Sequence, residues 1–221
     1  MQDLIKQEQF ELEVLEKLNT AKVLNNLVFC GDTMLRLCFG LNRYSVDLDF
    51  WVIKDLDFKD LFKKVENILS KEYTITDSAN KFYTIIFEIK SPDYPRSLKI
   101  EIRKEKKDIK VESSIAYSKN SNIQVFLNTV SLSDMLQAKI NAFLNRKEIR
   151  DCFDLEFLLK KGIVLDAPAD RLKKLLEQIE TLSKNDYAIK LGSLLQASER
   201  PYYSKENFKI LKSKINQLLA I

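Results

Sequence analysis

The chain of 221 residues contains no histidine. Catalysis by a Ser-His-Asp or Cys-His arrangement is therefore excluded, and so is a zinc site with histidine ligands. Any catalysis must then depend on carboxylates, lysines, hydroxyl groups or a metal ion bound through oxygen atoms.

Cysteine, glycine and proline are scarce, with three, four and four residues. The spacing of Cys30, Cys38 and Cys152 matches neither a zinc site nor a disulfide framework, so we expect a reduced, cytoplasmic compartment. No run approaches the roughly 18 apolar residues of a membrane span, so we expect no membrane association. Residues 1–18 alternate apolar and charged side chains, which is typical of an amphipathic helix and not of a signal peptide.

A large excess of one charge is also lacking, because 36 basic and 32 acidic side chains leave a net charge of +4. This balance does not by itself indicate a nucleic-acid partner, so a basic patch would have to be local. The densest basic stretch is interrupted by three acidic residues and contains Lys99, Arg103, Lys104, Lys106, Lys107 and Lys110. A solvated lysine-rich hairpin and a phosphate-facing surface both account for it.

Hydrophobic periodicity predicts a mixed first part and a helical second part. Helices are expected at 3–19, 33–39 and 58–69, and strands at 27–30, 46–53, 82–90, 98–104 and 123–130. From residue 131 on, helices are expected at about 131–145, 148–161, 168–182, 186–197 and 205–219. We predict an α/β (α+β) fold, with a mixed sheet and flanking helices in a domain of residues 1–130. A helical bundle, residues 131–221, is expected to follow and to form the other wall of a cleft.

Two aspartates stand on one face of the strand predicted at 46–53. Side chains alternate along a strand, so Asp47 and Asp49 lie roughly 6.6 Å apart on the same side. Two such carboxylates repel each other and lose hydration, and a divalent cation is the simplest compensation. Glu101 lies in another apolar strand; if the two strands are neighbours, three carboxylates converge and can hold metal ions. Magnesium, or manganese, bound by Asp47, Asp49 and Glu101 is the predicted metal site.

A glycine turn precedes the aspartates. Gly31 joins a strand to a helix, where a glycine permits close backbone approach and the first helical amides suit a phosphate. Thr33 adds a hydroxyl donor to this turn. We therefore predict that this turn, with Gly31 and Thr33, suits a phosphate group.

In the helical part, Lys139 projects into the middle of an apolar arc that also contains Leu136 and Phe143. A lysine there is costly unless it is paired or contacts a ligand. Asp151 lies in the inward stripe of the next helix. Either Lys139 and Asp151 form a buried ion pair between the two helices, or Asp151 orients Lys139 toward a triphosphate, and both can hold at once.

Taken as a set, these motifs resemble the signature of the AbiEii/AbiGii-type nucleotidyltransferases, the toxins of bacterial toxin–antitoxin and phage-abortive infection systems. The upstream half of the signature reads Gly31-Asp32-Thr33-x-Leu35-Arg36-Leu37-x-x-Gly40-x-x-Arg43-x-Ser45-x-Asp47-Leu48-Asp49-Phe50. The downstream half is Lys139 followed by Arg150-Asp151-x-x-Asp154-Leu155. The resemblance covers most of residues 25–162 and implies a nucleotidyltransferase-like sheet.

By this resemblance the chain transfers a nucleoside monophosphate from a nucleoside triphosphate to an RNA hydroxyl, most simply the 3′ end of tRNA, and a cognate antitoxin exists. The implied catalytic residues are Asp47, Asp49, Glu101, Lys139 and Asp151. The implied nucleotide-binding residues are Gly31, Thr33, Arg43, Ser45, Lys139 and Asp154. For Arg43 and Ser45, exposure to solvent alone is the competing interpretation. For Tyr202 and Tyr203, packing at a helix junction competes with stacking on a base.

Two departures from the family pattern leave rival functions open. Asp32 stands where the family usually has a second glycine, and it either weakens triphosphate binding or caps the helix. Glu101 stands where the third carboxylate is commonly aspartate. The rivals are transfer to a protein or small-molecule hydroxyl, and a degenerate member that binds nucleotide without catalysis.

Overall fold

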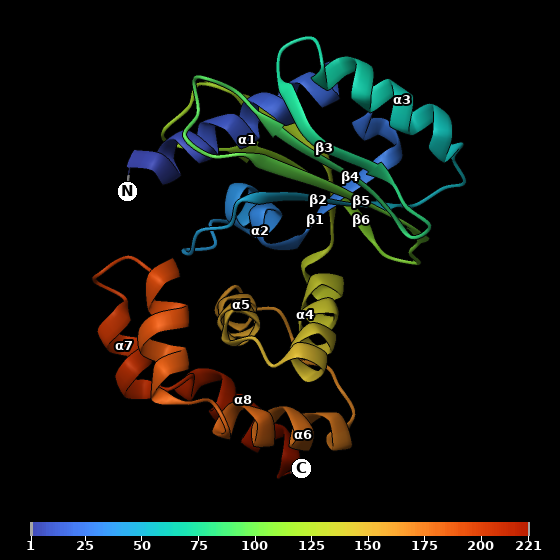
Figure 1. The fold of residues 1–221 in the computed structure, drawn as a ribbon. Coiled ribbons are helices and arrows are strands. Elements are labelled where there is room, and N and C mark those ends of the chain that lie inside the picture. Colours follow the sequence, from blue (N-terminus) through green and yellow to red (C-terminus); the bar gives the residue numbers. More distant parts are fainter. Residues whose placement is uncertain (1, 221) are drawn as a thin grey trace. The chain divides into compact units, whose positions relative to one another are not determined.

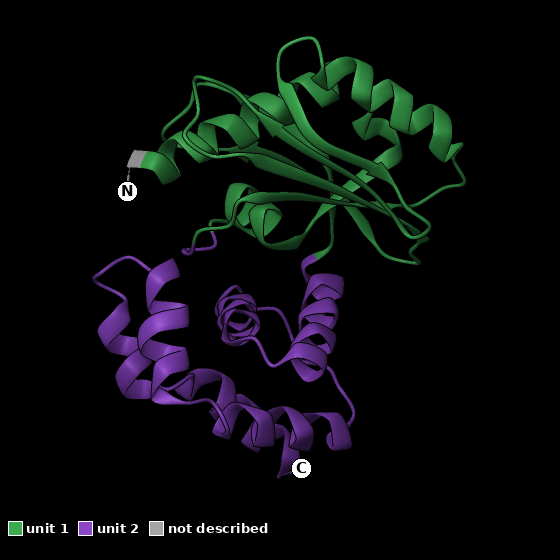
Figure 2. Ribbon diagram, in the orientation of Figure 1, with its two compact units in different colours: residues 1–40, 44–131 green, residues 41–43, 132–221 purple. Residues whose placement is uncertain are grey.

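The computed structural model describes residues 2–220, and their contacts divide the chain into two compact units (Figure 2). Unit 1 contains the residues up to Gly40 together with Tyr44–Ser131, and unit 2 contains Leu41–Arg43 together with Leu132–Ile221. Residues 41–43, which the sequence analysis assigned to the first domain, thus group with the second unit.

Unit 1 is built on a seven-stranded mixed sheet of order β3-β4-β5-β2-β1-β7-β6. The pairs β1–β7 and β2–β5 are parallel, and the other neighbours are antiparallel. The strands are β1 (Leu27–Cys30), β2 (Asp47–Val52), β3 (Thr74–Asn80), β4 (Thr84–Lys90), β5 (Leu98–Lys106), β6 (Val111–Tyr117) and β7 (Gln124–Val130).

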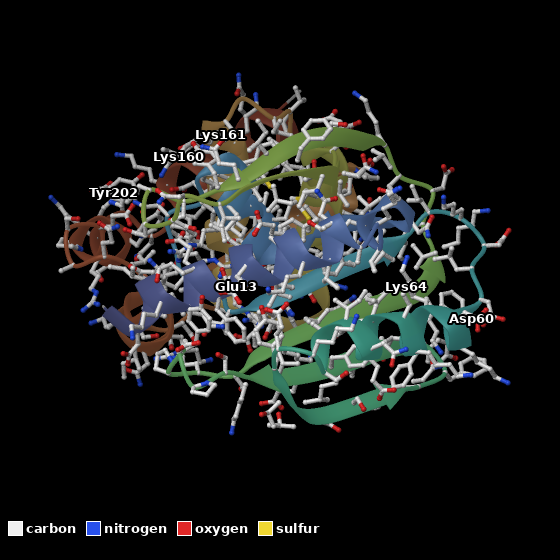
Figure 3. All side chains as sticks on the ribbon, turned by 90° about the horizontal axis from the view of Figure 1, so that it is seen from above. Glu13, Asp60, Lys64, Lys160, Lys161 and Tyr202 are labelled. Carbon is white, nitrogen blue, oxygen red and sulfur yellow. The ribbon has the colours of Figure 1, made fainter. Side chains whose placement is uncertain are left out.

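Helices cover both faces of this sheet (Figure 1). The helices α1 (Gln2–Thr20) and α3 (Phe58–Leu69) lie on one face, and α2 (Gly31–Phe39) lies on the other. A short 3-10 turn, Leu24–Asn26, leads into β1. Figure 3 looks onto the first face, where Glu13 marks α1 and Asp60 marks α3.

Two helix ends of unit 1 form for local reasons that the sequence makes visible. Asp57 caps α3 by accepting hydrogen bonds from the amides of Lys59 (2.8 Å) and Asp60 (3.1 Å), as expected for an N-cap aspartate. Gly40 ends α2 in the left-handed conformation, with φ of 77°. The predicted class, a mixed sheet with flanking helices followed by a helical region, is confirmed.

Unit 2 is helical. Its elements are α4 (Leu132–Arg146), α5 (Ile149–Lys160), α6 (Ala169–Glu180), a π-helical turn η2 (Asp186–Leu191), a 3-10 turn η3 (Gly192–Leu194), α7 (Arg200–Glu206) and α8 (Lys209–Leu219). The apolar arc of α4 is buried as its spacing indicates, with Leu136, Ile140 and Phe143 all inaccessible to solvent. Within residues 2–220, no helix combines the length and the apolar character needed to cross a bilayer.

Four segments differ from the sequence prediction. Neither β3 nor β6 was predicted, and both are edge strands whose side chains are mostly polar or exposed, so apolar alternation is weak there. The helix predicted at 186–197 is a pair of irregular turns. The helix predicted at 205–219 is interrupted because Asn207 and Phe208 adopt positive φ angles of 48° and 56°.

Candidate active site

Strand β2 places Asp47 and Asp49 on the sheet face that carries α2. Burial alternates along the strand, so Leu48 and Phe50 are buried while the two aspartates are only partly covered. Asp49 is the register partner of Cys30, the last residue of β1, and of Glu101 on β5. Asp49 therefore lies between the strand that leads into the glycine turn and the strand that carries the third carboxylate.

Gly31 is required because Asp49 occupies the space beside it. Gly31 has φ of +79°, and a Cβ added there would lie 2.7 Å from Asp49 Oδ2. The absence of a side chain at Gly31 thus allows the Asp49 carboxylate to lie close to the backbone of the turn. The amino end of α2, where the helix dipole and the first amides attract anions, begins at the same residue.

Asp49 lies in a strongly negative surrounding. Burial, followed by the charges of Asp32, Asp47 and Glu101, raises the pKa of Asp49 from 3.8 to about 7, and Arg103 offsets this only in part. Asp32 lies in the first turn of α2, so its charge acts on the site. The carboxylates that the sequence singled out are therefore close enough to oppose one another's ionisation.

Glu101 is already paired with two cations. Its Oε2 accepts a hydrogen bond from Lys99 Nζ at 2.8 Å, and its Oε1 lies 3.4 Å from Arg103 Nε. The bond to Glu101 raises the pKa of Lys99, and the charges of Asp47 and Asp49 add to it. The pKa of Asp49 stays raised although these cations are nearby. A further positive charge beside Asp47, Asp49 and Glu101 would therefore be favourable.

The aspartate pair fits a divalent cation. Magnesium commonly binds about one or two carboxylates and completes its shell with water and substrate phosphates. Within residues 2–220 no group of three or more acidic or thiol side chains is arranged to hold a metal ion. Asp47 and Asp49 are therefore the residues that would hold it, and Glu101 as a third ligand stays a prediction.

Thr33 and Ser45, both predicted to bind phosphate, differ in their burial. Thr33 is fully buried, and its hydroxyl has no hydrogen-bond partner among the described residues. Ser45 is half-buried in the segment before β2. Their contact with a triphosphate stays a prediction.

In unit 2, five charged side chains form a mostly buried network. Arg43 Nε donates a hydrogen bond to Asp154 Oδ1, and Arg43 Nη2 donates one to Asp154 Oδ2, each at 2.6 Å. Lys139 Nζ lies 2.5 Å from Asp154 Oδ2 and 3.5 Å from Asp151 Oδ1. Arg146 donates to both oxygens of Asp151, at 2.8 and 2.6 Å. Lys139 and Arg43 are only 3% and 2% exposed, and both aspartates are fully buried.

Lys139 and Asp151 thus form a buried ion pair between α4 and α5, and Asp154 is the closer partner of Lys139. Arg43 is not simply solvated, because it is buried against Asp154 and draws residues 41–43 into unit 2. A contact of Lys139, Arg43 or Asp154 with a triphosphate stays a prediction.

A polar cluster that the sequence reasoning missed joins α1, α2 and the segment before β7. Arg36 Nε donates to Glu8 at 3.0 Å, and the Arg36 guanidinium lies 4.1 Å from the Tyr44 ring centre. Asn120 also donates to Glu8, at 3.0 Å. Glu11 is fully buried, neither of its oxygens has a hydrogen-bond partner among the described residues, and burial raises its pKa well above the usual range. No spacing pattern signals this cluster, because its members come from distant segments.

The structure shows the packing of the tyrosine pair and the strand arrangement around the basic stretch. Tyr203 is buried against Phe153 and Phe208, so packing accounts for it, while Tyr202 is partly exposed beside Lys160, whose Nζ lies 5.0 Å from its ring (Figure 3). The basic stretch does not form a hairpin, because β5 and β6 are not neighbours in the sheet.

The mixed sheet carries a strand–glycine–helix turn beside two aspartates on the neighbouring strand, as the sequence analysis expected of a nucleotidyltransferase-like sheet. Two solved structures share this fold. The crystal structure of JHP933 from Helicobacter pylori shares 24% identity with the chain over 94% of each chain, with a TM-score of 0.56. A second protein of H. pylori, described as a "putative nucleotidyltransferase", shares 22% identity over 95% of this chain and 97% of its own, with a TM-score of 0.60. At these identities the likeness shows the fold.

The family is shown by sequence. Residues 13–216 match the family described as nucleotidyl transferase AbiEii toxin, type IV TA system, and the chain belongs to this family. No curated protein matches the chain by sequence. Membership of the AbiEii family confirms the resemblance drawn from the motifs.

Proposed function

We propose that this chain transfers a nucleoside monophosphate from a nucleoside triphosphate to a hydroxyl of RNA, with the 3′ end of tRNA as the acceptor. Membership of a nucleotidyltransferase toxin family supports the reaction class. The observation that carries the proposal is Asp49, a carboxylate held beside the glycine turn among three other carboxylates, with its pKa raised to about 7.

In this proposal Asp47 and Asp49 hold magnesium or manganese. A bound divalent ion would lower the pKa of the attacking hydroxyl and neutralise the pyrophosphate leaving group. Asp49 must be ionised to bind it, so the negative surrounding that opposes ionisation also favours the ion. Gly31 and the amino end of α2 bind phosphate, with Thr33 and Ser45 as additional hydroxyl donors.

Glu101 is proposed to accept the proton of the attacking hydroxyl or to complete the metal site. Either role requires at least one of its pairs with Lys99 and Arg103 to open. A carboxylate poised between two cations and next to Asp49 in the register is well placed to exchange one partner for another.

The network of unit 2 is proposed to hold Lys139 and Arg43 for the triphosphate. Asp151 and Asp154 fix Lys139 within hydrogen-bonding distance, which preorganises its charge. The outcome in the cell would be growth arrest, opposed by the cognate antitoxin that a toxin–antitoxin family implies. We expect the reaction to take place in the cytoplasm.

The test is a labelling assay with purified protein, magnesium, each labelled triphosphate in turn, and total tRNA. Label in the RNA of the wild-type reaction, and none with Asp49→Asn, is the expected result. Asp60→Asn is the matched control, because Asp60 is an exposed aspartate of the same unit, on α3 over the other sheet face. If label appears only on protein or on a small molecule, that molecule is the acceptor and RNA is not.

A second candidate, nucleotide binding without catalysis, is favoured by Asp32 and by the two ion pairs of Glu101. Triphosphate binding by calorimetry without any labelled product would establish it in place of transfer.

A further inference from the structure

Two aromatic side chains project into solvent at the turn between β3 and β4. Phe82 is 84% exposed and Tyr83 is 74% exposed, and their rings meet edge-on with centres 4.6 Å apart. The turn is held by a hydrogen bond from Lys81 N to Thr84 O at 2.8 Å. Exposure of large apolar side chains is unfavourable in water, so this pair is a candidate contact surface whose charged surroundings decide what it can bind.

The charges around this turn are mainly positive. Lys104 donates from its backbone to Tyr83 O at 2.9 Å, and its Nζ contacts Lys81 O. Among the described residues neither Lys81 nor Lys104 has a carboxylate partner. Arg103 is the register partner of Thr84, next to the turn, and Lys106 follows on the same strand. Cations that flank exposed aromatic rings are the combination that binds single-stranded nucleic acid, by phosphate contacts and base stacking.

The register connects this turn to the carboxylate site. Asp49, Glu101 and Ile86 are aligned across β2, β5 and β4, and Trp51, Arg103 and Thr84 are aligned two residues further along. Tyr83, just before β4, is thus three residues from the row that contains Asp49, roughly 10 Å along the strand direction, and Asp49 lies two strands across, roughly a further 10 Å. A single strand stacked on the turn can therefore reach the carboxylates within a few nucleotides.

We propose that the Phe82–Tyr83 turn, with Lys81, Arg103 and Lys106, binds single-stranded RNA and guides the acceptor end along the sheet toward Asp49. This inference rests on the proposed function, because it supplies the docking surface for the RNA acceptor. The flanking cations favour RNA over an apolar protein partner, whose interface would be poorer in lysine.

The first test compares two double variants of exposed aromatic residues. F82S with Y83S removes both rings from the turn, and Y117S with F126S removes two rings that are 57% and 65% exposed on β6 and β7, at the opposite edge of the sheet. Both variants should keep the wild-type melting temperature, because the four rings are exposed. The Kd for a short 5′-labelled single-stranded RNA, measured by fluorescence anisotropy, should rise about tenfold or more for the turn variant and stay unchanged for the control.

The second test measures the electrostatic part. K81Q with K106Q removes two exposed cations; Lys106 has an acidic neighbour, Asp55 at 3.6 Å, and Lys81 has no ion pair within residues 2–220. The slope of log K against log salt should fall by about 1 for each lost phosphate contact. An unchanged slope together with an unchanged Kd of the turn variant would overturn the inference.

Separate readouts distinguish this inference from the proposed function. If wild type labels RNA and the turn variant has the same KM for RNA, the turn inference is wrong and the proposed function stands. If wild type binds RNA through the turn but labels no RNA, the proposed acceptor reaction is wrong and the binding surface stands. If wild type binds no RNA at all, both are overturned. In the turn variant, KM for the triphosphate should remain at the wild-type value.

Discussion

Asp49 of unit 1 and the aspartates Asp151 and Asp154 of unit 2 have opposite electrostatic surroundings. In unit 2, Asp154 and Asp151 lie within hydrogen-bonding distance of Arg43, Lys139 and Arg146. In unit 1, Asp49 is opposed by three other carboxylates, and the nearest cations are engaged by Glu101. Carboxylates that are matched inside the protein serve its structure, whereas a carboxylate that is left unmatched points to a ligand.

The largest effect on stability is expected from Asp154→Asn. Loss of this charge leaves two buried cations, Arg43 and Lys139, without their closest partner. The free energy of unfolding should fall by about 3–5 kcal/mol in urea denaturation. Asp170→Asn, at an exposed aspartate on α6 of the same unit, should change it by less than about 0.5 kcal/mol. A small loss at Asp154 would show that the network contributes little.

Asp49→Asn, in contrast to Asp154→Asn, should increase the free energy of unfolding. Because its pKa is about 7 in the folded protein and 3.8 in the unfolded chain, ionisation destabilises the fold progressively as pH rises from about 4 to about 7. Asp49→Asn should therefore raise the free energy of unfolding at pH 8 by at most about 4 kcal/mol, and by nothing at pH 3. Urea denaturation at both pH values checks this, and destabilisation at pH 8 would make Asp49 a structural aspartate.

A cation should stabilise wild type and not the Asp49→Asn variant. A ligand at a hundred times its Kd stabilises the folded state by about 2.7 kcal/mol. Addition of magnesium or manganese should raise the Tm of wild type, and chelation should reverse the rise. An equal rise in the variant would place the ion elsewhere.

The smallest effect is expected from Asp32→Asn, as a shift in the pH dependence of labelling. Among the charges that raise the pKa of Asp49, that of Asp32 contributes most, and the substitution removes it. Labelling requires ionised Asp49 and should decline as pH falls through its pKa. In the variant the acid limb of the pH–rate profile should move to lower pH. An unmoved limb would mean that the limb does not report the ionisation of Asp49.

The sequence was sufficient for elements whose burial repeats with a regular period. The alternation around Asp47 and Asp49 predicted β2, and Asp57 followed by an apolar stripe predicted α3. It was insufficient where partners come from distant segments. The pairing of Arg43 with Asp154 spans 111 positions, and the contact of Gly31 with Asp49 depends on how β1 and β2 align. Periodicity tells which face a side chain occupies, but not what it meets there.

The path of the chain has a consequence for dividing this protein. Because residues 41–43 belong with the helices, the backbone passes from one unit to the other three times, after Gly40, Arg43 and Ser131. A cleavage after Ser131 would separate Arg43 from Asp154 while leaving it four positions from Asp47. The C-terminal fragment would lack residues 41–43 of its own unit, so reassembly of the two fragments should depend on reinsertion of that short loop.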